Sequence, residues 1–127
     1  MNVEDFTQMD KKDILKDKSF SFAIRIVKVY QYLTDEKKEF VISKQLLRSG
    51  TSIGANIREA KNAESAKDFV HKLHIAQKEC DESLYWAELL FASQYLTELE
   101  FQSISNDAIE ILKILKSSIL TVKQRIK

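Results

Sequence analysis

The sequence has no proline, only two glycines and a single cysteine among its 127 residues. Turn-rich β-sandwiches, β-barrels and glycine-loop folds need proline or glycine at fixed points, so these classes are disfavoured. Cys80 by itself forms neither an internal disulfide nor a zinc site, which favours a reducing compartment. No apolar run reaches the roughly 18–20 residues of a membrane span, and the N-terminus lacks a signal-peptide core. We therefore expect a cytoplasmic protein.

What is present is typical of one globular domain, because 44% of the residues are hydrophobic and 31% are charged. Apolar residues recur at steps of three and four along four segments, which is the spacing of one helix face. The segments cover residues 19–34, about 40–62, 65–91 and 101–126. We predict an all-α fold, namely an antiparallel up-down-up-down four-helix bundle over residues 19–127. Residues 1–18, which are polar and mixed in charge, are expected to form a loose N-terminal arm or a short first helix.

Local signals sharpen this prediction. Ser65 with Asp68, and Thr97 further on, are typical of helix N-caps. The sequence RSGTSIGANI in the second segment contains Gly50 and Gly54, each of which costs about 1 kcal/mol relative to alanine in a helix. The apolar register continues through both glycines, so we predict helix there and close approach by another helix. In the first segment a second apolar stripe lies beside the main one and predicts burial on a wide front. That stripe consists of Phe20, Ala23, Val27 and Tyr30.

Charge is unevenly distributed, although the net charge is only +1. Residues 79–112 contain eight acids and no Lys or Arg, whereas residues 113–127 contain five bases and no acid. We expect an acidic end at the turn between the last two helices and a basic end at the opposite tip. One interpretation is that the bases complement helix dipoles and keep the surface soluble. The other is a phosphate-binding rim that becomes strong when several copies assemble. Its candidate residues are Arg48, Arg58, Lys61, Lys113, Lys116, Lys123, Arg125 and Lys127.

The second and third helices each carry a polar stripe, and the two stripes would meet if these helices pack side by side. Arg48 and Lys72 would then find carboxylate partners on the facing helix. One interpretation is a solvated face, and the other is a polar network that fixes helix register or a subunit interface. The aromatic residues Tyr85, Trp86 and Tyr95 lie near the same end and are natural interface anchors. The residues of this set are Arg48, Ser52, Asn56, Glu59, Asp68, Lys72, Glu79, Glu82, Tyr85 and Trp86.

Catalytic and metal-binding signals are weak. A di-iron bundle needs Glu-x-x-His on two helices, and the nearest match is the single Asp68-x-x-His71 followed by His74. Cys80 lies on the apolar line of its helix and is better interpreted as a small core residue than as a nucleophile. No phosphate-binding glycine motif is present. We therefore predict no metal, no cofactor and no enzymatic activity.

The segment QLLRSGTSIGANIREA, residues 45–60, resembles the signature of a bacterial family of four-helix-bundle proteins encoded in intervening sequences of 23S ribosomal RNA genes. The resemblance continues through SAKDFVHKLHIAQKECDESLYWAELL, residues 65–90. It implies a bundle that assembles into a ring, a homopentamer. It also implies similarity to the accessory protein of diversity-generating retroelements, a pentameric barrel that binds nucleic acid and a reverse transcriptase.

Two functional hypotheses follow from the residues and the resemblance together. The first is a non-catalytic oligomeric bundle that binds structured RNA or DNA through its basic surface. The second is a protein-interaction scaffold in which the acidic end and the Tyr/Trp cluster recognise a protein partner. No membrane partner is expected under either hypothesis.

Overall fold

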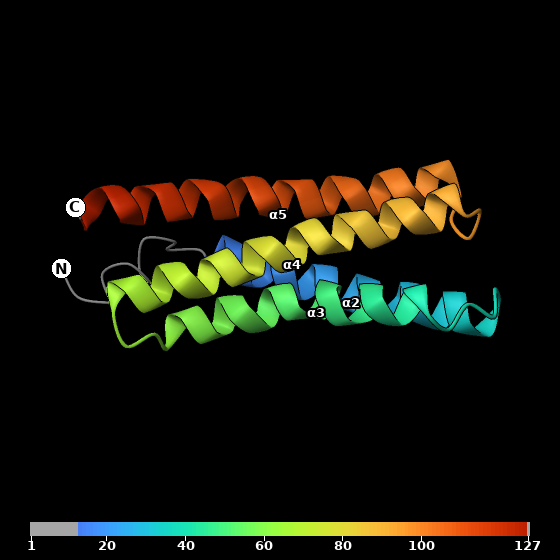
Figure 1. Ribbon diagram of the computed structural model, residues 1–127, viewed down its shortest axis with the longest axis horizontal. Coiled ribbons are helices and arrows are strands. Elements are labelled where there is room, and N and C mark those ends of the chain that lie inside the picture. Colours follow the sequence, from blue (N-terminus) through green and yellow to red (C-terminus); the bar gives the residue numbers. More distant parts are fainter. Residues whose placement is uncertain (1–12, 127) are drawn as a thin grey trace.

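The computed structural model describes residues 13–126, and these form four α-helices joined by short connections (Figure 1). The helices are α2 (Ile14–Asp35), α3 (Ile42–Lys61), α4 (Ala66–Ala92) and α5 (Glu98–Arg125). Consecutive helices run antiparallel, so the predicted up-down-up-down four-helix bundle is confirmed. The most extensive packing is between α3 and α4, whereas α2 and α5 touch much less.

The two ends of the bundle differ in charge as the sequence predicts. The α4–α5 connection lies at one end, and the C-terminal part of α5 lies at the other, beside the α3–α4 connection (Figure 1). Glu98 and Glu100 occupy the first turn of α5, while Lys123 and Arg125 occupy its last turn. These charges also complement the helix dipole at each terminus.

The core is a single apolar cluster to which every described helix contributes. Side chains such as Ile26, Leu33, Leu73 and Leu115 are almost wholly excluded from solvent. The helix α2 begins at Ile14, five residues before the predicted start at residue 19. The reason is that Leu15 is buried and extends the core stripe by one more turn, which the mixed charge of the arm conceals.

The predicted helix through the glycines of α3 is confirmed, and the close approach comes from α2 of the same chain. A Cβ atom added at Gly50 would lie 2.9 Å from both Cγ1 and Cγ2 of the buried Ile26. A Cβ atom at Gly54 would lie 3.3 Å from Oγ of Ser19. The small residues therefore serve packing within one chain, and by themselves they are no evidence for neighbouring subunits.

Replacing Gly50 with alanine tests this packing. The substitution gains about 1 kcal/mol of helix propensity but overpacks the core beside Ile26, which typically costs about 1–3 kcal/mol. The matched control is Gly54→Ala, where only a serine hydroxyl has to rotate. We expect Gly50→Ala to be less stable than Gly54→Ala by about 1–2 kcal/mol in urea unfolding. Equal stabilities would contradict a tight α2–α3 contact at Gly50.

The prediction that the second stripe of α2 is buried holds only in part, because Ala23 and Tyr30 are half-buried whereas Phe20 and Val27 are exposed. Phe20 remains 52% exposed and Val27 38% exposed, because α3 and α5 cover only the side that carries Phe22 and Ile26. Ile24 adds a further exposed apolar side chain to the same helix. The helix α2 therefore presents an apolar outer face.

The helix caps are partly those that the sequence predicts. Ser65 accepts a hydrogen bond from the Asp68 amide, and Thr97 forms a capping box with Glu100. The start of α3 uses a cap that the sequence did not reveal. The carboxylate of Glu39 accepts hydrogen bonds from the amides of Val41, Ile42 and Ser43 at 2.6–3.1 Å. Burial alone would raise the pKa of Glu39, but these hydrogen bonds outweigh it and lower the pKa.

Candidate nucleic-acid interface

A basic line follows the outer side of α5. Lys113, Lys116 and Lys123 are exposed, and none of them forms an ion pair with another described residue. They are separated by three and seven residues, so they lie along one side of the helix. No acidic residue follows Glu110 in the sequence. These lysines therefore carry positive charge that the described part of the chain leaves uncompensated.

A second basic line lies on the neighbouring helix. The N-terminal half of α4 carries Lys67, His71, His74 and Lys78, all exposed and at steps of four, three and four. Because α4 and α5 are antiparallel, this half of α4 lies alongside the C-terminal half of α5 (Figure 1). The two lines therefore belong to one surface, which we call the basic α4/α5 face.

The electrostatics of individual groups show that the two lines are close. Slight burial lowers the pKa of His74, and the charges of Lys123 and His71 lower it further. Burial raises the pKa of Cys80, and the charge of Lys116 lowers it by a smaller amount. The exposed Asp81 follows Lys78 by three residues on α4, and its charge helps to raise the pKa of Cys80. The face is thus predominantly basic, with one carboxylate at its margin.

The structure brings together only part of the predicted phosphate-binding set. Arg48 is engaged in ion pairs on the α3–α4 side, and Lys61 Nζ lies 2.7 Å from Oδ1 of Asp13. The guanidinium of Arg58 lies over the ring of Phe20, 5.2 Å from its centre. These three bases are therefore separate from the basic α4/α5 face.

The remaining predicted bases lie at or beyond the end of α5. Arg125 is exposed but only two residues from Lys123, so it faces another side of the helix. Lys127 lies outside the described residues. Sequence reasoning missed the α4 line, although its helical spacing was present, because His71 and His74 were considered only as metal ligands.

The predicted polar stripes of α3 and α4 do meet. Arg48 Nη1 lies 3.1 Å from Oε2 of Glu79, and Nη2 pairs with Oε2 of Glu82. The indole Nε1 of Trp86 donates a hydrogen bond to the same Glu82 oxygen at 3.0 Å. Glu82 therefore links an arginine of α3 to an aromatic anchor of α4. The carboxylate of Glu79 is better covered than the Arg48 side chain, which stays half-exposed.

Other members of that set have smaller roles. Lys72 Nζ lies 3.5 Å from Oε2 of Glu59, which is a second link between the two helices. Ser52 and Asn56 donate hydrogen bonds to backbone carbonyls of their own helix, and Asp68 accepts one from the amide of Glu64. Tyr85 packs edge-on against Trp86 with ring centres 4.9 Å apart and is 58% exposed. The network fixes how α3 and α4 pack, and its role as a subunit interface stays a prediction.

A buried contact that the sequence did not suggest lies beneath this network. Ser83 of α4 donates a hydrogen bond to Oγ of Ser49 of α3 at 2.9 Å, and both side chains are buried. The two small serines allow α3 and α4 to approach closely and satisfy each other's hydroxyl group. They help to set the register of the ion pairs above them.

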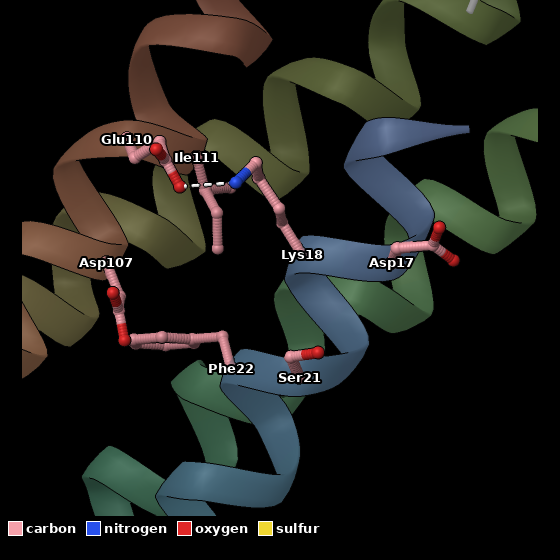
Figure 2. A pocket seen from close by; sticks show the side chains of 7 residues that line it. All are labelled: Asp17, Lys18, Ser21, Phe22, Asp107, Glu110 and Ile111. Atoms are coloured by element: carbon pink, nitrogen blue, oxygen red, sulfur yellow. Dashed lines mark hydrogen bonds and ion pairs between the residues drawn. The ribbon is translucent and has the colours of Figure 1, made fainter. Parts of the chain in front are cut away.

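Two surface hollows follow the α2–α5 seam, with volumes of about 270 and 280 Å³. Figure 2 shows the first, where Lys18 of α2 reaches across to Glu110 of α5 at 2.7 Å. Further along the seam, Arg25 pairs with Asp107 at 2.6 Å and also hydrogen-bonds Ser103. Two of the carboxylates beside the first hollow, Asp107 and Glu110, are therefore held in ion pairs that join α2 to α5.

The weak catalytic signals in the sequence do not converge in space. Cys80 is wholly buried and its thiol donates to the carbonyl of Ala108, 3.1 Å away. Burial raises the pKa of Cys80 to about 12, so the thiolate nucleophile is not populated near neutral pH. Its assignment as a core residue is confirmed. Among residues 13–126 there is no group of three His, Cys, Asp or Glu side chains able to hold a metal ion.

The fold and the two helix-pair surfaces define a small four-helix-bundle protein with a polar α3–α4 side and a basic α4/α5 face. The chain belongs to the 23S rRNA-intervening sequence protein family, which it matches over residues 11–117. The resemblance seen in the helix α3 and α4 sequences is thereby confirmed.

A solved structure gives a second comparison. It is the crystal structure of a protein with unknown function from the S23 ribosomal protein family of Bacteroides thetaiotaomicron. The two chains share 57% sequence identity with a TM-score of 0.83, and the match covers 84% of this chain and 98% of the other. No curated protein matches the sequence. None of the described helices has a stretch both long and apolar enough to cross a bilayer.

Proposed function

We propose that this protein is a non-catalytic RNA-binding protein whose basic α4/α5 face contacts the phosphates of structured RNA. The observation that carries the proposal is the unpaired lysine line of α5 beside the line of lysines and histidines on α4. Such side chains position a phosphate backbone but do not read base sequence. The ligand is therefore selected by charge and shape, and the same face accepts DNA with little discrimination.

Assembly is the second part of the proposal. The outer face of α2 exposes Phe20, Ile24 and Val27, and a second copy of the chain would cover these apolar side chains. The resemblance to pentameric relatives makes five the expected subunit number. Repetition of the basic α4/α5 face around a ring would multiply the phosphate contacts of one chain.

The direct test is RNA binding measured across salt concentration. A protein that neutralises several phosphates releases counterions, so the logarithm of affinity falls linearly with the logarithm of salt. We expect a steep slope for an RNA hairpin and for duplexes of unrelated sequence. A flat titration at low salt would overturn the RNA-binding proposal.

The assembly proposal is tested by light scattering. The wild type is expected at about five times the 14.7 kDa of one chain. Phe20→Ser with Val27→Ser removes the apolar face of α2, whereas Arg48→Ala and Trp86→Ala remove the α3–α4 network. Whichever variants lower the mass identify the surface between subunits. A wild type that stays monomeric at all concentrations would overturn assembly through either surface.

A protein-interaction scaffold remains the second candidate, because exposed apolar side chains also gather at the acidic end. Leu99 at the start of α5 is 80% exposed, and Phe40 and Val41 in the α2–α3 connection are exposed as well. Acids at Glu98 and Glu100 would favour a basic partner. A defined protein recovered from a pull-down and insensitive to nuclease would favour this candidate over RNA binding.

A further inference from the structure

The basic α4/α5 face contains both histidines of the chain. His71 and His74 lie between Lys67 and Lys78 on the exposed line of α4. Histidine is the side chain whose ordinary titration falls between pH 5 and 8. The α4 line therefore has a lysine at each end and two histidines between them.

In the protein alone, His74 is held towards its neutral form. Slight burial, the charge of Lys123 from α5 and that of His71 on its own helix all lower its pKa. The other charged groups of this face are Lys67, Lys78, Lys113, Lys116 and Asp81. Lysine and aspartate side chains ordinarily titrate well outside the range of pH 5 to 8, so their charges are constant there.

A phosphate placed on this face would reverse the balance. An anion within about 4–6 Å favours the charged form of an imidazole, and it also neutralises the lysine that repels the imidazolium. Each histidine that touches the phosphate would then take up a proton on binding and donate a charge-assisted hydrogen bond.

We infer that His71 and His74 are phosphate-binding residues whose protonation is coupled to RNA binding, so that affinity for RNA rises as the pH falls. This inference rests on the proposed RNA-binding function and adds a regulatory property to the same site. Proton uptake on binding means that a fall in pH favours the complex. A tenfold gain in affinity is expected for each histidine whose pKa rises by one unit on binding.

The experiment measures the affinity of the full chain for a fluorescent RNA hairpin at low salt, from about pH 8 to about pH 5.5. The variants are His71→Gln with His74→Gln, which removes both titrating groups, and His74→Lys, which makes one charge permanent. Both positions are exposed, so neither variant disturbs the core.

We expect the wild-type affinity to rise by about tenfold or more across this range. The double glutamine variant should lose that rise, and His74→Lys should bind more tightly than the wild type at high pH. Binding that is present but independent of pH would overturn this inference and leave the proposed function standing. A pH response that survives in the double variant would also overturn it. Absence of binding at every pH would instead overturn the proposed function.

Discussion

Replacing Lys113, Lys116 and Lys123 together by glutamate is expected to abolish RNA binding at moderate salt. The three lysines form the α5 half of the basic α4/α5 face and have no ion-pair partner among residues 13–126. Each lost phosphate contact should reduce the salt slope by about one, so the triple variant should lose roughly two to three units of slope. The affinity at low salt should fall by about a hundredfold or more. Filter binding across salt measures both quantities.

A matched control separates location from net charge. Lys28, Lys37 and Lys44 are also exposed, but they lie on α2, on the α2–α3 connection and at the start of α3. Their replacement by glutamate changes the net charge of the chain by the same amount. We expect this control to weaken binding far less than the α5 variant. An equal loss in both would show that RNA responds to overall charge and has no defined site on α4 and α5.

Truncating Leu115 to alanine is expected to destabilise the bundle by about 2–5 kcal/mol, the range found for buried leucines. The side chain is wholly excluded from solvent and fills the core beneath α5. The same change at Leu120, five residues along the helix and 59% exposed, should shift stability by no more than about 0.5 kcal/mol. Chemical denaturation of the two variants compares equal losses of side-chain volume inside and outside the core. Similar effects at both positions would contradict the orientation of α5.

Most of the fold was predictable because the apolar spacing is regular over all four helices. The register continued through Gly50 and Gly54, and the caps at Ser65 and Thr97 follow residue types that are typical of helix starts. The start of α2 was missed because acids and lysines surround Leu15 in the sequence. The α3 cap was missed because Glu39 acts from outside the helix, and glutamate is uncommon in that role.

The site was predictable only where two adjacent helices carry stripes of complementary charge. Arg48 and Lys72 were expected to find partners among Asp68, Glu79, Glu82 and Glu59, and Arg48 pairs with two of these, because two polar stripes on adjacent helices have few ways to meet. The basic α4/α5 face depends on how two helices are rotated relative to each other, which spacing along one helix does not fix. For the same reason, the exposure of Phe20 and Val27 could not be inferred from the stripe they form.

The thin α2–α5 seam has a consequence for how the chain folds. The three well-packed seams each join helices that are neighbours in sequence, so most native contacts close short loops. Topologies of this kind reach the native state within microseconds to milliseconds, because little loop-closure entropy opposes them. The first and last helices, α2 and α5, meet through the ion pairs Lys18–Glu110 and Arg25–Asp107. Surface ion pairs of this kind contribute little free energy of folding by themselves. We therefore expect α2 and α5 to associate late in folding.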